Sequence, residues 1–330
     1  MTIKYYNVYL EGMATVVGKI EHDGPLSRRF DRYYEDFYMH EDSFENAEMH
    51  LMQESVDILL DKVNKKNKDI DLFIAGDLQN QITASCFTAK YLNIPFLGIY
   101  SACATNVEGL ILASTMIDSK KINNSIISVS SHNMVSERQF RNPTEYGAPK
   151  PSSATFTATG GASAYLSNKK SDIKIESSTI GKVIDMEQID PNNMGAVMAG
   201  AAIDTIYNHL KDLKRDVSYY DLILTGDLGR YGKEILLEYM QKEYQLDLSK
   251  NYNDCGIMLY DLENQKDVQA GGSGPVCSAL VVYGDIIPKM KNKEIKRVLY
   301  VATGALFNPT TVFQKQNILS IAHAISLEVV

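Results

Sequence analysis

The chain has 330 residues, of which 45% are hydrophobic and 22% charged, as in a globular protein of one large or two ordinary domains. The formal net charge is -8 and the basic residues form no dense cluster, which argues against nucleic-acid binding. The longest apolar stretches fall well short of the roughly 20 residues that cross a bilayer, and the N-terminus lacks the pattern of a secretory signal. We therefore expect no membrane span and synthesis in the cytoplasm.

The first 50 residues begin with a strand-like segment at 6–10 and continue into a charged, aromatic stretch at 28–36. An amphipathic helix is predicted over 48–65, because five apolar residues fall on one of its faces: Met49, Met52, Val56, Leu59 and Leu60.

A longer pattern then occurs twice. Asp71-Leu-Phe-Ile-Ala-Gly-Asp-Leu-Gln79 recurs as Asp221-Leu-Ile-Leu-Thr-Gly-Asp-Leu-Gly229, and both read as apolar strands that end in a Gly-Asp turn. A repeat of this length indicates a duplicated domain rather than a solenoid, whose repeats span about 20–50 residues.

Each copy continues alike. The predicted elements are a helix (82–91; 231–244), a turn of small residues at a helix start (101–103; 271–274), an apolar helix (110–121; 279–293) and a strand (125–131; 297–303). A long loop is predicted at 132–160, a polar loop-and-hairpin region at 246–269 and a last strand at 317–330. Alternating strands and helices predict an α/β fold with mostly parallel, buried strands, in halves 1–170 and 171–330.

The carboxyl ends of the predicted strands carry the polar and small residues, and ligand sites in such folds lie at these ends. Cys103 opens the apolar helix of the first half, where backbone N–H groups favour a thiolate or another anion. The four cysteines form no Cys-x-x-Cys pair and the six histidines no His-x-x-x-His pair, so we predict reduced thiols and no structural metal.

Duplicated α/β halves with a cysteine at the start of the central helix resemble the thiolase and ketoacyl-synthase superfamily. A closer resemblance is to the stage V sporulation protein AD family. It rests on five motifs taken together: Gly98-Ile-Tyr-Ser-Ala-Cys-Ala-Thr105, Ser130-Ser-His-Asn133, Glu137-Arg-Gln-Phe-Arg141, Pro143-Thr-Glu-Tyr-Gly147 and Gly271-Gly-Ser-Gly274.

The superfamily resemblance implies a five-layered αβαβα fold and a homodimer. The closer one implies a protein that binds dipicolinic acid and works with other membrane proteins of a transport assembly. Such a protein would load the acid into the developing spore, as a peripheral component at the forespore or spore inner membrane. No resident cofactor is implied, although calcium can accompany the ligand.

Acyl-transfer enzymes of the superfamily activate the cysteine with partners from the second half, and here each is replaced. Asp227 stands where the resemblance implies a histidine, Gly272-Ser-Gly-Pro275 replaces Gly-His-Pro, and Ala302-Thr-Gly304 replaces Cys-x-Gly. These replacements favour a binding protein. The intact Ser-Ala-Cys-Ala turn favours the alternative, an acyltransferase or condensing enzyme that uses Cys103. A structural subunit with a vestigial pocket is a third interpretation.

The candidate ligand-binding residues all come from strand ends and helix starts. They are Cys103, Ser101, His132, Asp227, Arg230, Gly272, Ser273, Thr303 and Asn308, with Tyr100, Phe307 and Met194 as candidates for packing against the ligand ring. His132 has three open interpretations: a loop histidine bonded to the backbone, a ligand contact or a catalytic base. Asp227 has two, a cap of the next helix or a pocket residue.

Overall fold

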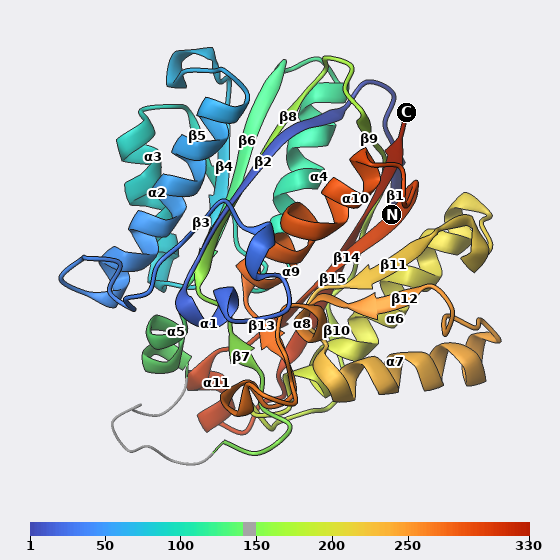
Figure 1. Ribbon diagram of the computed structural model, residues 1–330. Helices are drawn as coiled ribbons and strands as arrows, with labels where there is room; N and C mark the ends of the chain where they lie inside the picture. The colour runs from blue at the N-terminus through green and yellow to red at the C-terminus, as the bar shows by residue number, and fades with distance from the viewer. Residues whose placement is uncertain (141–149) are drawn as a thin grey trace.

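The computed structural model describes residues 1–140 and 150–330, shown in Figure 1. The main elements of the first half are β2 (Tyr9–Val17), α2 (Phe44–Lys62), β4 (Phe73–Gly76), α3 (Thr83–Leu92), β5 (Phe96–Gly98), α4 (Thr105–Asp118), β6 (Asn124–Ser131) and β8 (Gly160–Ser167). Those of the second half are β9 (Ile173–Ile180), α6 (Met194–Leu213), β11 (Leu222–Thr225), α7 (Gly229–Tyr244), β12 (Tyr252–Asp254), α9 (Pro275–Val281), α10 (Ile287–Lys291), β14 (Arg297–Leu306) and β15 (Leu319–Val329).

Shorter elements connect them. They are β1 (Thr2–Lys4), α1 (Lys19–His22), β3 (Arg32–Tyr33), α5 (Asn133–Phe140), β7 (Phe156–Thr157), β10 (Ile184–Asp185), α8 (Cys255–Met258), β13 (Gly272–Ser273), α11 (Pro309–Phe313), and a π-helical turn, Val282–Ile286, between α9 and α10. None of the helices in the described residues is long and apolar enough to span a membrane.

The principal strands follow the order β12-β11-β14-β15-β9-β2-β8-β6-β4-β5. Counted from the two ends of the sheet, corresponding strands of the two halves occupy equivalent places, for example β11 and β4. In each half, four of the five strands run in one direction. The fifth, β8 or β15, lies antiparallel between its neighbours, and β2 joins β9 where the halves meet. The predicted duplication and the mostly parallel strands are confirmed. The boundary at residue 170 stays a prediction.

The helices lie in three layers around the two halves of the sheet (Figure 1). Helices α2 and α3 cover the outer face of the first half, and α6 and α7 cover that of the second. Helix α4 packs between the halves against β6 and β14, next to α9. This arrangement is the predicted αβαβα layering, and it directs the N-termini of α4 and α9 toward the strand ends.

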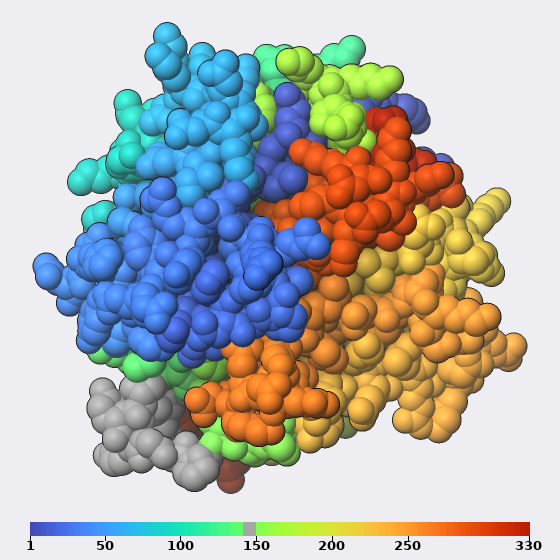
Figure 2. All heavy atoms as spheres, in the orientation of Figure 1, coloured from blue at the N-terminus to red at the C-terminus, as the bar shows by residue number. Residues whose placement is uncertain are grey.

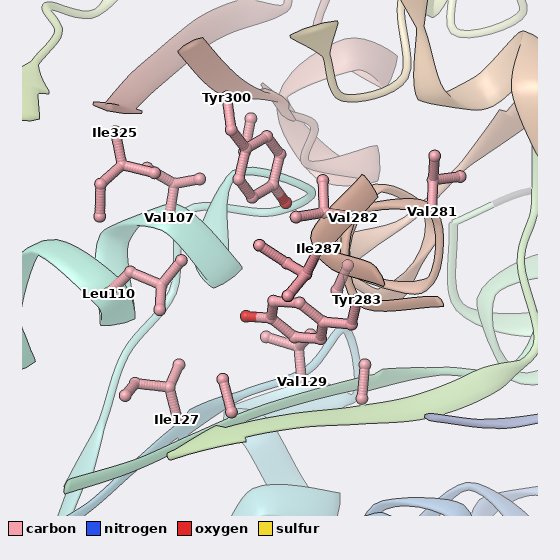
Figure 3. Close-up of a cluster of buried hydrophobic side chains, with 14 of the residues drawn as sticks. Val107, Leu110, Ile127, Val129, Val281, Val282, Tyr283, Ile287, Tyr300 and Ile325 are labelled. Atoms are coloured by element: carbon pink, nitrogen blue, oxygen red, sulfur yellow. The ribbon is translucent and has the colours of Figure 1, made fainter. Parts of the chain in front are cut away.

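The core between the halves is apolar but contains a set of bonded polar groups (Figure 3). Val107 and Leu110 of α4 pack among the buried side chains there. The amide of Asn106 accepts a hydrogen bond from the Tyr283 hydroxyl at 3.0 Å and donates one to the Tyr300 hydroxyl at 3.1 Å. These bonds satisfy groups that would otherwise be costly to bury, and they tie α4 to the second half.

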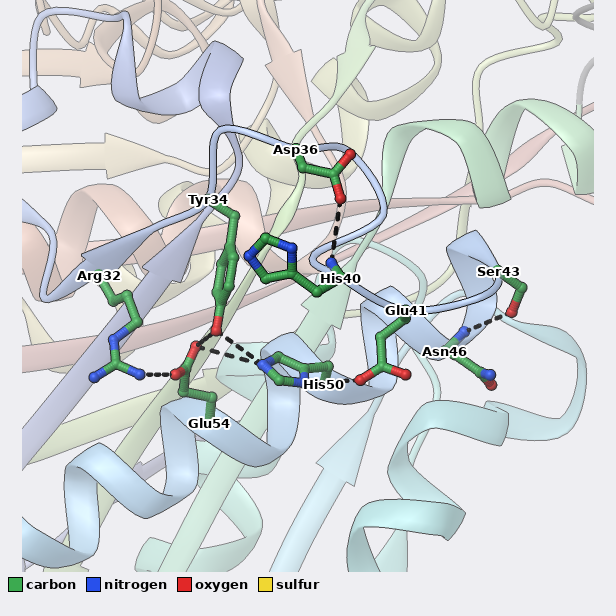
Figure 4. Close-up of polar contacts among 9 residues, drawn as sticks. All are labelled: Arg32, Tyr34, Asp36, His40, Glu41, Ser43, Asn46, His50 and Glu54. Atoms are coloured by element: carbon green, nitrogen blue, oxygen red, sulfur yellow. Dashed lines mark hydrogen bonds and ion pairs between the residues drawn. The ribbon is translucent and has the colours of Figure 1, made fainter.

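Helix α2 begins earlier than the predicted residue 48, because the Ser43 hydroxyl accepts a hydrogen bond from the Asn46 N–H at 3.1 Å and caps the helix. The preceding segment folds back onto α2, where the Tyr34 hydroxyl donates to Glu54 at 2.7 Å and bonds His50 at 2.8 Å (Figure 4). Figure 2 shows this blue segment on the surface beside the orange C-terminal half, and Arg29 lies 3.6 Å from Asp285 there.

Two predictions from the sequence need correction. Residues 246–269 form no hairpin. Instead β12 pairs in parallel with the buried strand β11, and the Thr225 hydroxyl bonds Tyr252 and Asp254 at 2.7 Å across this pair. The predicted loop at 132–160 contains the helix α5 and the strand β7. The predicted motif 143–147 and Arg141 lie outside the described residues.

Candidate functional site

Cys103 lies on a tight turn between β5 and α4. Ala102, just before it, has a φ of 50°, in the left-handed region that a residue with a side chain rarely adopts. The turn is held by the Thr105 hydroxyl, which accepts from the Ser101 N–H at 3.0 Å and donates to the Ala102 carbonyl at 2.6 Å. Gly304 of β14 packs closely on it, since a Cβ there would lie 2.3 Å from the Ser101 carbonyl oxygen. The cysteine is therefore held at a fixed point between the halves.

Cys103 lines a narrow cavity of about 60 Å³ to which both halves contribute. The other residues that line it are Leu78, Tyr100, Ala102, Ser136, Phe140, Thr157, Met194, Met198, Asp227, Ser273, Gly274, Ala305 and Phe307. The walls are mostly apolar and aromatic, and the rings of Phe140 and Phe307 lie 5.8 Å apart. Tyr100, Phe307 and Met194, the candidates for ring packing, all lie in these walls.

Asp227 is the one carboxyl group among the described residues that line the cavity. The Thr303 hydroxyl donates to its Oδ1 at 2.5 Å and the Gly274 N–H to its Oδ2 at 3.3 Å. The Cys103 side chain also hydrogen-bonds this carboxyl. Burial dominates over these bonds and raises the pKa of Asp227 to about 7. Cys103, Asp227, Ser273 and Thr303 are thus the predicted site residues that the fold brings together.

The capping role that was open for Asp227 is taken by Asp254, at the end of β12. Its carboxylate accepts from the N–H groups of Leu228 at 2.9 Å and Gly229 at 3.0 Å, at the start of α7. This leaves the Asp227 carboxyl to the cavity. In the first half the Asp77 carboxylate bonds Gln79 and Ser85, at the start of α3, as a cap does.

His132 does not line the cavity. Its Nδ1 accepts from the Met134 N–H at 3.2 Å, so its Nε2–H donates to the Phe37 carbonyl at 2.9 Å. The ring packs against Phe44 at 5.2 Å between centroids, and burial lowers its pKa to about 4. Of its three interpretations, the structure agrees with a neutral histidine bonded to the backbone.

Five other predicted residues also lie outside the lining. Thr303 is one of them, and it bonds the lining residue Asp227. The Ser101 hydroxyl turns away and donates to Glu108 at 2.6 Å. Arg230 and Asn308 are exposed, and the Asn308 side chain caps α11 by accepting from the Thr310 N–H at 2.9 Å. Gly272 is buried in the pairing of β13 with β7.

The sequence reasoning missed several wall residues. Met198 lies one helical turn after the predicted Met194, so helical spacing could have identified it. Ser136 and Phe140 lie one turn apart on α5, in a segment that was predicted to be a loop. Leu78 follows the Gly-Asp turn of the first half and Ala305 lies near the end of β14, so both belong to strand ends.

The overall structure is similar to solved structures of thiolase-like enzymes. The alignment with the 3-oxoacyl-[acyl-carrier-protein] synthase III of Aquifex aeolicus VF5 covers 97% of this chain and 99% of that chain. Its TM-score is 0.60 at 12% sequence identity. The alignment with a structure of Xanthomonas campestris OleA covers 99% of both chains, with a TM-score of 0.62 at 11% sequence identity. At this identity the likeness concerns the fold, which places the chain among proteins with a thiolase-like, synthase III type of architecture.

The sequence gives the family. The model of the stage V sporulation protein AD (SpoVAD) family matches residues 2–328. Stage V sporulation protein AD of Bacillus subtilis (strain 168) is 43% identical over 321 residues, which are 97% of this chain and 94% of the relative. The chain belongs to the stage V sporulation protein AD family, and its resemblance to that family is confirmed.

Proposed function

We propose that this chain is a non-catalytic protein of thiolase-like fold that binds dipicolinic acid, free or as its calcium complex. We also propose that it takes part in the uptake of the acid into the developing spore. The observation that carries this proposal is the pairing of Cys103 with the buried carboxyl of Asp227 inside the cavity.

This pairing is unsuited to nucleophilic catalysis. An acyl transfer needs a base that takes the thiol proton and a donor that stabilises the developing oxyanion. An ionised aspartate opposes a thiolate through like-charge repulsion, and a protonated one cannot accept the proton. Among the described residues that line the cavity there is no histidine that would replace it.

The shape and chemistry of the walls favour a flat aromatic acid. Tyr100, Phe140 and Phe307 offer ring faces and edges, and Met194 and Met198 are adaptable apolar neighbours. Polar side chains are few among the lining residues, and they include Cys103, Ser136, Thr157, Asp227 and Ser273. A mostly apolar cavity with a few polar groups is the common form of a small-molecule site.

The remaining parts of the proposal rest on the family. We propose that the protein acts as a homodimer, together with other membrane proteins of a dipicolinate transport assembly, at the forespore or spore inner membrane. We propose no resident cofactor, and calcium as a companion of the ligand where the calcium complex is bound. Membership of the stage V sporulation protein AD family supports this setting.

Calorimetric titration with dipicolinic acid, with and without calcium, tests the binding. The variant Cys103→Trp fills the cavity and should lose saturable binding while keeping its unfolding temperature. Cys86→Trp is the matched control, because Cys86 is exposed on α3 and does not line the cavity, so its binding should equal that of the wild type. Absence of binding by the wild type, or equal binding by Cys103→Trp, would refute the proposal.

An acyltransferase that uses Cys103 is the second candidate, because the cysteine stands on a strained turn at the start of α4 and faces a cavity. Intact-mass measurement after incubation with acyl-coenzyme A distinguishes the two functions. Acylation of the wild type that is absent in Cys103→Ala would favour the enzyme. An unchanged mass together with ligand binding would favour the carrier.

A further inference from the structure

The charge balance of the cavity bears on which form of the ligand it accepts. Among the described residues that line the cavity, Asp227 is the one with a carboxyl group. These residues include no lysine, arginine or histidine. A flat dicarboxylate that enters with both carboxyls ionised therefore meets a third carboxyl and no cation. Because the Asp227 carboxyl is buried, this repulsion is weakly screened.

We propose that Asp227 is the specificity-determining residue of the cavity, which accepts the dicarboxylate only together with one neutralising cation. This cation is either a proton held by Asp227 or a divalent metal ion already chelated by the ligand. This inference rests on the proposed function and adds to it the form of ligand that the site selects.

The surroundings of Asp227 fit a group that gains and loses a proton in place. The Thr303 hydroxyl at 2.5 Å and the Gly274 N–H at 3.3 Å hold the carboxyl on two sides without adding charge. Cys103 bonds it from the turn before α4, and Asp254, at the end of β12, adds a like charge. The described residues that line the cavity around it include no lysine, arginine or histidine.

Of the titratable groups packed around Asp227, Asp254 exchanges its proton at the nearest pH, because burial raises its pKa to about 6, below that of Asp227. The other groups stay protonated near neutral pH. Cys255 and Cys277 are fully buried, which raises the pKa of both thiols. Tyr100, at the cavity wall, has its pKa raised to about 12 by burial. The pKa of Asp227 itself, about 7, puts its proton exchange within the range in which binding can be measured.

The sign of the effect follows from linkage. Below pH 7 the carboxyl already holds its proton, so affinity for the free ligand should be constant. Above it, each binding event must take one proton from the buffer, and affinity should fall about tenfold per pH unit. The calcium complex carries its own neutralising cation, so its affinity should change less than about threefold between pH 6 and 8.5.

Calorimetric titration at several pH values, in two buffers with different enthalpies of ionisation, measures both the affinity and the protons taken up. At pH 8 the wild type should take up about one proton with free dipicolinate and close to none with the calcium complex. Asp227→Asn should bind the free ligand with no pH dependence and no proton uptake. A role of Asp227 in folding alone would not produce proton uptake.

A second variant keeps the inference testable if Asp227→Asn does not fold. Thr303→Val removes a donor that stabilises the ionised carboxyl, so the fall in affinity should begin at higher pH than in the wild type. Thr205→Val is the matched control, because Thr205 is buried in α6 and bonds the Ala322 carbonyl at 2.9 Å away from the cavity. It should leave the profile unchanged.

Two failures can be told apart. A wild type that binds the free ligand equally well from pH 6 to 8.5, without proton uptake, overturns the selection by Asp227 and leaves the carrier function standing. A wild type that binds neither form at any pH overturns both.

Discussion

The hydrogen bonds of Asn106 in the core between the halves should contribute measurably to stability. Replacing Asn106 with Leu leaves the buried Tyr283 hydroxyl without the acceptor at 3.0 Å, which costs about 1–3 kcal/mol. Tyr300 loses the bond at 3.1 Å but keeps Ser278 at 2.5 Å, which adds about 0.5–1.5 kcal/mol. We therefore expect Asn106→Leu to lower the free energy of unfolding by about 1.5–4.5 kcal/mol.

A double-mutant cycle isolates this pairing. Tyr283→Phe leaves the Asn106 amide oxygen without its donor, but in the double variant neither partner remains buried and unpaired. The combined loss should therefore be smaller than the sum of the single losses by about 1–3 kcal/mol. Urea unfolding at constant protein concentration measures all four proteins, and Tyr91→Phe, whose hydroxyl is on the surface, should change little. Losses that add within about 0.5 kcal/mol would refute the reasoning.

Three further predictions concern the turn, a buried acid and the N-terminal segment. Gly304→Ala should abolish ligand binding, measured by calorimetry, because its Cβ would lie 2.3 Å from the Ser101 carbonyl oxygen; unchanged binding would mean that the turn can shift. Burial raises the pKa of Glu48 to about 8, so the folded state binds its proton more tightly than the unfolded state does. The unfolding free energy of the wild type, measured with urea, should therefore fall relative to that of Glu48→Gln as the pH rises from about 5 to 8. A difference between the two proteins that stays constant with pH would contradict this. Tyr34→Phe should lower the unfolding free energy by about 0.5–1.5 kcal/mol through loss of the bonds to His50 and Glu54, and no change in the urea midpoint would contradict the contact in Figure 4.

The sequence predicted the strands and helices whose apolar pattern is local. The two Gly-Asp strands at 71–79 and 221–229 became β4 and β11, since buried parallel strands are continuous apolar runs that end in turns. Strand β8 was missed because Gly160–Ser167 is built of small residues, and it is a strand through its pairing with β2 and β6. Pairing between distant segments leaves little trace in the local sequence.

The same distinction applies to the site. Cys103, Asp227 and Ser273 were predicted because the position of a strand end or helix start is set by the fold. The fold class does not set the direction in which a side chain points from such a position. The Ser101 hydroxyl bonds Glu108, and the His132 ring bonds a backbone carbonyl. The sequence correctly predicted that the site lies at the carboxyl ends of the strands. It did not predict which side chains at these ends line the cavity.

The central claim is that dipicolinate occupies the cavity between the halves, and diffraction from a crystal grown with the ligand tests it most directly. The account predicts density for the flat ring between the walls formed by Tyr100, Phe307 and Met194, with one carboxyl group near Cys103 and Asp227. Ligand density at another place on the protein, with this cavity unchanged, would contradict it.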